Sequence, residues 1–278
     1  MPARQFFIII QTLIALALSN ALVLIGFKRF EALILQSGAA AVPIVSASRM
    51  IIAFLLASAV LFILVRHLRK RVVFEVIFSL SILVGIWAFF ELYMVSELAL
   101  AVALFLIAMR YLLPRVIAQN AIMLIGIAGI GVFLGAAVRW QSMLAVLLIL
   151  AVYDVIAVYG THHMVAMFKG LLEKGVIFAL IIPERPRLIF KRLREVKAGE
   201  RFFFLGSGDV ALPAVFVASA AREGLAFGIG AAVGSLVGLF FTDLLFQWGR
   251  KRPMPALPPI AAGTLAGFFI TMGLRAIA

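Results

Sequence analysis

The sequence predicts an all-α fold, a polytopic membrane protein with nine transmembrane helices. The prediction depends on composition, on the length of the apolar runs and on the placement of the basic residues. Of the 278 residues, 65% are hydrophobic and 13% are charged, whereas a soluble domain is about 45–50% apolar and about 25% charged. A soluble fold of this size has too little interior for that apolar surface, so most of it must face lipid.

Apolar segments of about 17–25 residues predict membrane spans, because a helix satisfies its own peptide groups where lipid offers no partner. The first run is longer than the core of a signal peptide, and we interpret it as a retained span. The nine expected helices are 6–26, 44–65, 72–92, 95–113, 120–138, 140–160, 202–221, 225–247 and 256–275.

The basic residues give the predicted orientation. With the N-terminus inside, 19 of the 25 Lys and Arg residues fall in inner segments, nine of them between Lys169 and Arg201. Because positive charge collects on the cytoplasmic side, we expect a multi-pass protein of the cell membrane with its N-terminus cytoplasmic and its C-terminus outside. The hydrophilic stretch 161–201 is predicted to be an interfacial amphipathic segment on anionic lipid. A regulatory or partner-binding loop is the alternative.

Several kinds of site are disfavoured by the residues present. Without cysteine there is no disulfide framework, no thiolate zinc site and no cysteine nucleophile. His162 and His163 are adjacent and would point in different directions on a helix, so we expect no metal. The basic clusters form no single stripe with aromatic residues, which argues against a nucleic-acid partner. No cofactor is expected.

All three aspartates, Asp154, Asp209 and Asp243, lie within expected spans, where an ionisable group costs at least about 2.5 kcal/mol. Asp154 lies about 21 Å past Trp140 and Asp209 about 10 Å past Phe202, at 1.5 Å per residue on helices that run in opposite directions. These depths sum to about 31 Å, close to the roughly 30 Å of the hydrocarbon layer. Asp154 and Asp209 are therefore expected to meet at one level, nearer the cytoplasm.

Two carboxylates in a low-dielectric site share a proton, because both cannot easily ionise. The ionised member could accept a proton from water while the protonated member polarises a carbonyl, which gives amide hydrolysis without a metal or a covalent intermediate. Asp243 lacks neighbouring glycine or proline. We predict that it makes a structural polar contact or a snorkelling pair with basic residues at the inner interface.

Two local sequences support a site near these acids. Gly206-Ser207-Gly208 precedes Asp209, so the backbone could approach closely or leave helical geometry there, unless the glycines serve only helix packing. Four prolines in residues 253–259 favour extended backbone. Such backbone is tolerated at membrane depth where it lines a cavity, although a plain proline-rich helix start is the alternative. An unwound substrate segment could pair with enzyme backbone as an added strand.

Three motifs resemble the presenilin and signal peptide peptidase family: Tyr153-Asp154, Gly206-Ser207-Gly208-Asp209 and Pro255-Ala256-Leu257. The resemblance implies an intramembrane aspartyl protease that hydrolyses peptide bonds within or near transmembrane segments, with Asp154 and Asp209 catalytic. It implies that the substrate site is formed by Tyr153, Gly206, Ser207, Gly208, Pro255, Ala256 and Leu257. Ser207 stands where the family usually has leucine, which bears on substrate preference.

The resemblance also implies an organisation and a set of partners. Residues 1–139 would form a scaffold of five helices, and 140–278 a catalytic half with the cytoplasmic loop 161–201. The orientation is presenilin-like and the compact chain resembles a microbial, archaeal-like homologue. We expect transmembrane-helix substrates of opposite orientation and no obligatory accessory subunit. A homo-oligomer is compatible with the sequence.

Two other classes would use intramembrane acids. A proton-coupled secondary transporter predicts acids nearer the midplane and paired interruptions in the two halves of the chain, and neither is apparent. A peptidase of the prepilin type shares a glycine-aspartate motif but acts on a cytoplasmic loop, and it is not expected to carry Pro255-Ala256-Leu257.

Overall fold

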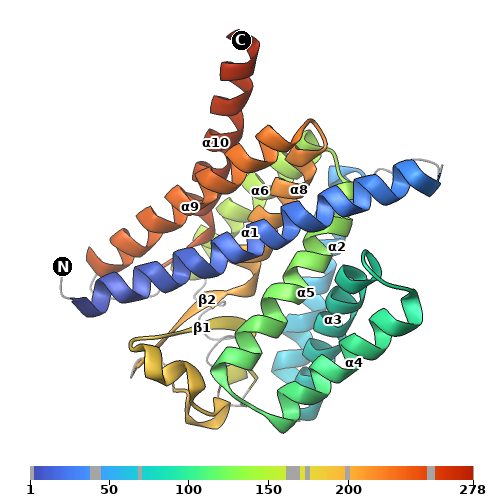
Figure 1. The fold of residues 1–278 in the computed structure, drawn as a ribbon. Coiled ribbons are helices and arrows are strands. Elements are labelled where there is room, and N and C mark those ends of the chain that lie inside the picture. The colour runs from blue at the N-terminus through green and yellow to red at the C-terminus, as the bar shows by residue number, and fades with distance from the viewer. Residues whose placement is uncertain are drawn as a thin grey trace.

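The computed structural model describes residues 3–37, 45–67, 71–160, 170–172, 176–197, 201–248 and 254–277. Over these residues the chain is a helical bundle with a small two-stranded sheet at one end (Figure 1). The elements are α1 (Ala3–Ser37), α2 (Ala47–His67), α3 (Arg71–Glu91), α4 (Ser96–Leu112), α5 (Val116–Ala137), α6 (Trp140–Val155), the π-helical η1 (Ile156–Gly160), β1 (Ala179–Pro183), the 3-10 helices η2 (Pro186–Phe190) and η3 (Leu193–Glu195), β2 (Phe202–Gly206), α8 (Ser207–Ala221), α9 (Leu225–Trp248) and α10 (Leu257–Ile277).

Two helices differ from the expected spans by more than a few residues. α1 continues to Ser37, well past the expected end, and carries the exposed Lys28 and Arg29 on its continuation. The prediction of a helix beginning at Phe202 is wrong, because residues 202–206 form β2 and the helix begins at Ser207. A run of aromatic residues favours a strand, and here β1 supplies the pairing partner.

Six helices of the described chain are long and apolar enough to cross a membrane: α1, α3, α5, α6 continued by η1, α9 and α10. α4 and α8 are shorter, at 17 and 15 residues. The helices thus support a multi-pass membrane protein, but the expected count of nine spans is not confirmed. Large apolar side chains such as Ile14, Leu18 and Ile25 of α1 are exposed, as side chains that face lipid would be.

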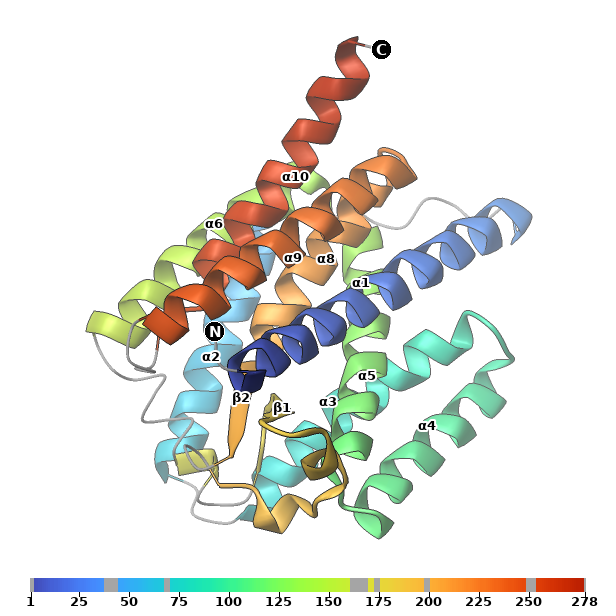
Figure 2. The same cartoon turned by 60° about the vertical axis from the view of Figure 1, so that its left-hand side comes forward.

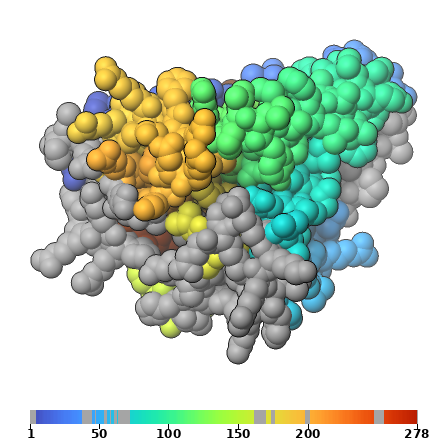
Figure 3. Space-filling model, turned by 90° about the horizontal axis from the view of Figure 1, so that it is seen from below, coloured from blue at the N-terminus to red at the C-terminus, as the bar shows by residue number. Residues whose placement is uncertain are grey.

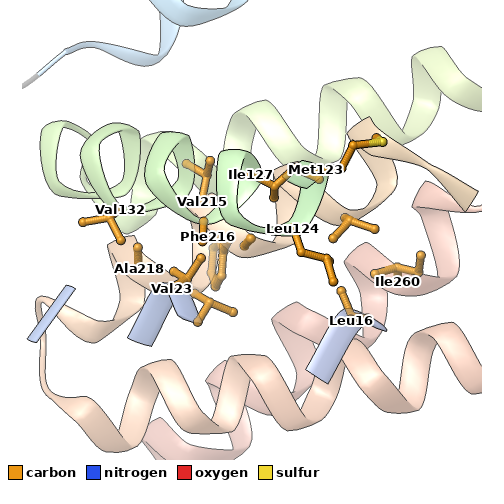
Figure 4. Packing of buried hydrophobic residues seen from close by; sticks show 14 of the residues in the cluster. Leu16, Val23, Met123, Leu124, Ile127, Val132, Val215, Phe216, Ala218 and Ile260 are labelled. Atoms are coloured by element: carbon orange, nitrogen blue, oxygen red, sulfur yellow. The ribbon is translucent and has the colours of Figure 1, made fainter. Parts of the chain in front are cut away.

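The interior is organised around α5, which packs against α1, α3 and α8. Figure 4 shows Ile127 and Val132 of α5 gathered with Val215 and Phe216 of α8 and Val23 of α1, and all five are buried. Because lipid tails are as apolar as these side chains, close van der Waals packing stabilises the cluster more than exclusion of water does. The cluster fixes α8, the helix that carries Asp209.

Glycines bring α9 and α10 unusually close together, and the two helices lie side by side in Figures 1 and 2. Gly234 and Gly238, four residues apart on α9, face Gly263 and Pro259 of α10. A Cβ atom at Gly234 would overlap the Gly263 carbonyl oxygen, and one at Gly238 would overlap that of Pro259. This small-residue packing sets the position of the start of α10.

The Gly234→Ala variant is expected to unfold at a lower temperature than wild type. Overpacking costs about 1–3 kcal/mol, which corresponds to a fall of roughly 2–10 °C in the Tm of the detergent-solubilised protein. Gly273→Ala is the matched control, because no atom lies within 4 Å of a Cβ built at Gly273. Equal Tm values for the two variants would contradict this account of α9–α10 packing.

The sheet consists of β1 and β2 in antiparallel register, with Ala179 opposite Gly206 and Pro183 opposite Phe202. Every residue of β1 is buried. The sheet was not predicted, since residues 161–201 were interpreted as an interfacial segment. Because β2 ends at Gly206, directly before α8, its pairing with β1 fixes the position of the Gly206-Ser207-Gly208-Asp209 motif.

The segment between the strands is amphipathic. Leu188, Ile189 and Leu193 pack against a buried cluster that includes residues of both strands, whereas the basic residues Arg185, Arg187, Lys191, Arg192 and Arg194 are exposed. Two backbone hydrogen bonds hold the segment at the start of α5: the Leu193 N–H donates to the carbonyl oxygen of Pro114 at 2.8 Å, and the Val116 N–H donates to that of Lys191 at 3.0 Å. Figure 3 shows it in yellow and orange beside the green start of α5. Its contact with anionic lipid stays a prediction.

Candidate active site

Asp154 lies one residue before the C-terminal end of α6, where the chain passes into the π-helical η1. Its side chain is buried, with 6% of the residue exposed. Single π-helical turns are rare and frequently occur at functional sites. The change of helical pitch directly after Asp154 therefore marks this end of α6 as a site candidate.

The start of α10 provides a hydrogen-bond partner for Asp154. The first N–H groups of a helix have no partner within the helix, and Pro258 and Pro259 have no N–H to offer. The Leu257 N–H donates to Oδ2 of Asp154 at 3.2 Å. Residues 254–256 before it have no regular secondary structure. The proline-rich stretch is thus more than a plain helix start, because it directs a single N–H group at an acid.

Gly206 is the junction between β2 and α8, so the expected departure from helical geometry is confirmed. Asp209 is the third residue of α8, and its carboxylate accepts the N–H of Gly206. The acid of a capping box makes the same contact. A Cβ atom at Gly206 would lie 2.7 Å from Oδ2 of Asp209. Because glycine has no Cβ atom, residue 206 leaves room for the carboxylate of Asp209.

Asp154 and Asp209 lie within electrostatic range of each other, on helices α6 and α8 that pack together and against α10. Asp209 lies in the first turn of α8, and Asp154 faces the first N–H of α10. Helix N-termini carry partial positive charge, so both carboxylates face a favourable helix end. The expected rise of 1.5 Å per residue from Phe202 to Asp209 is wrong for residues 202–206, because they form a strand, which rises about 3.3 Å per residue.

The other residues of the three motifs differ in their surroundings. Tyr153 is 37% exposed, and Pro255 is buried beside the half-buried Ala256. The Ser207 hydroxyl donates to the carbonyl oxygen of Phe178 at 3.1 Å, which ties the start of α8 to the residue before β1. Gly208 is exposed, and a Cβ built there would have no atom within 4 Å.

The hydrogen-bond partner of Asp243 is a residue outside the three motifs. Asp243 is half-buried on α9 and accepts a hydrogen bond from the hydroxyl of Thr12 on α1. The same pair of helices is joined by Asn20 and Ser235, whose side chains are 2.9 Å apart. The contact agrees with a structural role, although the partner is a threonine. The basic residues 250–252 lie outside the described residues.

Sequence reasoning missed three carboxamide residues, Gln11, Gln119 and Asn120. All three donate hydrogen bonds to backbone carbonyl groups of β1 or of the residues just before it. A signal was present, because a carboxamide inside or beside an apolar span is costly unless it has a partner. The sequence could not name that partner, since β1 itself was not predicted.

A metal centre finds no support among the described residues, in which no group of three His, Asp or Glu side chains could hold an ion. His162 and His163 lie outside the described part of the chain.

Comparisons with known proteins agree with this arrangement. The model of a family described as signal-peptide peptidase, presenilin aspartyl protease matches residues 5–277. A crystal structure in space group C222, described as a presenilin family intramembrane aspartate protease, has a TM-score of 0.65 at 20% identity and covers 95% of this chain and 97% of its own. A second with the same description, in space group P2, has a TM-score of 0.65 at 22% identity, covering 94% and 96%. No curated protein sequence matches.

The family match over nearly the whole chain places this apolar helical bundle in a class of hydrolases that work inside the membrane. The chain belongs to the signal-peptide peptidase and presenilin family of aspartyl proteases. It is an intramembrane aspartyl protease and hence a peptide hydrolase, and it shares the presenilin-type fold.

Gly208→Ala is expected to lower the rate of cleavage of a transmembrane peptide at least about tenfold, or ~1.4 kcal/mol in the barrier. No atom of the described residues lies within 4 Å of a Cβ built at Gly208, so the Tm should match that of wild type. The methyl would project into the exposed space beside Asp209, where we expect the substrate backbone to bind. Full activity in Gly208→Ala would show that the substrate does not approach along this face.

The hydrogen bond from Leu257 to Asp154 can be tested by comparing Leu257→Pro with Leu257→Ala. Proline is tolerated at the first position of a helix but has no N–H, whereas alanine keeps it. Both variants lose the leucine side chain, so their difference reports the lost N–H. We expect cleavage by the proline variant to be slower than that by the alanine variant by about tenfold or more, consistent with a charge-assisted hydrogen bond of about 1.5–3 kcal/mol. Equal rates in two folded variants would contradict the assignment.

Proposed function

We propose that Asp154 and Asp209 are the catalytic pair of this protease. The observation that carries the proposal is that the three motif segments converge: the Leu257 N–H at the start of α10 binds Asp154, which interacts electrostatically with Asp209 at the start of α8. These segments are far apart in sequence, with 103 positions between Asp154 and Leu257. A general structural need would not select two acids and bring both to helix N-termini.

The pair would hydrolyse a peptide bond with one shared proton. The ionised carboxylate takes a proton from a water molecule, and the water oxygen bonds to the scissile carbonyl carbon. The protonated carboxyl transfers its proton to the carbonyl oxygen, which gives a neutral tetrahedral diol. When this intermediate collapses, the C–N bond breaks and the leaving nitrogen takes the proton that came from water. One hydroxyl of the diol returns its proton to the other carboxylate, so the pair again holds one shared proton. No metal or covalent intermediate is needed.

The substrate is proposed to be a transmembrane segment that unwinds and pairs with β2 as an added strand. β2 leads through Gly206 into the helix that carries Asp209, so a strand paired with it would run toward the carboxylates. Tyr153, Ser207 and Gly208 would contact the bound segment from two sides. Pro255, Ala256 and Leu257 would line the remaining side, next to Asp154.

The placement of the chain in the membrane is likewise a proposal. It has nine spans in the cell membrane, with the N-terminus and the segment 161–201 cytoplasmic and the C-terminus outside, as the distribution of Lys and Arg favours. Residues 1–139 serve as the scaffold and 140–278 as the catalytic half. The packing of α1 and α5 against α8 supports this division of labour. Its partners are transmembrane substrates and lipid, without an obligatory subunit.

A proton-coupled transporter would also place acids inside a bundle, but this alternative is not favoured. The family match extends over nearly the whole chain, from residue 5 to residue 277. A transport function also gives no role to the hydrogen bond between Asp154 and the Leu257 N–H at the proline-rich start of α10.

The decisive variants are Asp154→Asn and Asp209→Asn, assayed in detergent or lipid with a transmembrane peptide. Each is expected to lose cleavage by at least about a thousandfold, because general acid and base catalysis contribute about 10²–10⁴ each. Asp243→Asn is the matched control, since that aspartate contacts Thr12 instead, and it should keep at least about half of the activity. Full cleavage by either Asp154→Asn or Asp209→Asn would refute the proposed pair.

A further inference from the structure

One edge of the sheet is already occupied by side chains of the protein. The N–H of Ile181, the central residue of β1, donates to Oδ1 of Asn120 at 2.9 Å. The carbonyl oxygen of Ile181 accepts from Nδ2 of the same side chain at 2.7 Å. A neighbouring strand makes this pair of bonds with a single residue. The carboxamide of Asn120, on α5, therefore takes the place of a strand at the middle of β1.

Two further carboxamides extend this contact along the same edge. Gln119 donates to the carbonyl oxygen of Ile177 at 3.1 Å, and Gln11 of α1 donates to that of Pro183 at 2.7 Å. Residues 177, 181 and 183 are separated by even numbers, so their carbonyl groups share one edge of an extended chain. Pro183 has no N–H to offer a further strand.

The orientation of Gln119 is fixed by a buried arginine. Nε of Arg110 donates to Oε1 of Gln119 at 2.6 Å, which leaves the Gln119 amide nitrogen to face Ile177. The Arg110 guanidinium lies 4.9 Å from the ring centroid of Phe78. Both Arg110 and Gln119 are buried. Because burying these polar groups is costly unless they are hydrogen-bonded, the arrangement holds one amide orientation.

The register of the two strands determines which backbone peptide groups a substrate strand could still bind. Since the peptide groups of Ile181 face Asn120, the ladder between the strands uses Leu180 and Ile182 with their partners Leu205 and Phe203. By alternation, Phe202 and Gly206 direct their peptide groups to the opposite edge of β2. The N–H of Gly206 does face that way, because it meets the Asp209 carboxylate.

We propose that Asn120, assisted by Gln119 and Gln11, closes the outer edge of β1 and holds the sheet in register, so that a substrate strand can add only to β2. This inference rests on the proposed function and names positioning residues for it. A strand added to β1 would lie on the far side of the sheet from Asp209. Slippage of β1 by one residue would carry the opposite side chains into the core, and it would move β2 and the scissile bond with it.

The test compares Asn120→Leu with Asn20→Leu. Both replace a carboxamide by an apolar side chain, but the hydrogen-bond partner of Asn20 is Ser235 of α9 and not a residue of the sheet. Two quantities are measured on the full-length protein in detergent. One is hydrogen exchange of the peptide that covers β1 without substrate, and the other is the set of product ends, by mass spectrometry, from a transmembrane peptide.

Asn120→Leu is expected to raise β1 exchange at least about tenfold and to spread cleavage over neighbouring bonds, whereas Asn20→Leu should stay within about twofold of wild type with a single product pattern. If the leucine variant does not fold, Asn120→Asp keeps the acceptor for the Ile181 N–H and lacks the donor, and it should show the same changes to a smaller degree.

Wild-type exchange and wild-type product ends in a folded Asn120 variant would overturn the proposal. The same spread of products in Asn20→Leu would also overturn the proposal, because the effect would then come from a general loss of rigidity and not from the contact between Asn120 and β1. If the wild-type protein cleaves no peptide, the proposed function fails, and the exchange measurement alone still decides whether Asn120 holds β1.

Discussion

The constraint on which this structure depends is that a membrane interior offers no water to an exposed peptide group. Most of the chain meets it with helices, whose peptide groups bond within the segment. Residues 202–206, which form a strand, and residues 254–256, which have no regular secondary structure, cannot do so. Pairing with β1 satisfies one edge of β2. Directly after residues 254–256, the N–H of Leu257 at the start of α10 is accepted by the carboxylate of Asp154. The acid therefore satisfies a peptide group that its own helix leaves without a partner.

The same constraint connects packing to chemistry. α8 is held by its contacts with α5, and α10 by the glycine-mediated approach to α9. These two helices present the N-termini that face Asp209 and Asp154. In lipid such contacts are stabilised by close packing and not by exclusion of water. The small residues between α9 and α10 therefore help to fix the start of α10, which supplies the N–H that Asp154 accepts.

The sequence predicted much of this, and its failures have physical causes. Hydropathy predicted most of the helices, and the acids in apolar segments, together with the glycine and proline motifs, led to the proposed site, because burying charge in lipid is costly enough to be informative. Hydropathy could not separate strand from helix at 202–206, since a short apolar run suits both. The depth estimate for Asp209 inherited that error. The roles of Gln11, Gln119 and Asn120 depend on β1, and a pairing partner that is distant in sequence leaves no local pattern.

The central claim, that Asp154 and Asp209 form one site before substrate binds, can be tested directly because the chain contains no cysteine. Asp154→Cys combined with Asp209→Cys creates the two thiols of the protein, and a short bifunctional thiol reagent applied to membranes without substrate measures their proximity. The account predicts an intramolecular cross-link in this double variant and none when Asp154→Cys is combined with Asp243→Cys. Absence of the 154–209 cross-link in folded protein, or equal cross-linking in both double variants, would contradict it.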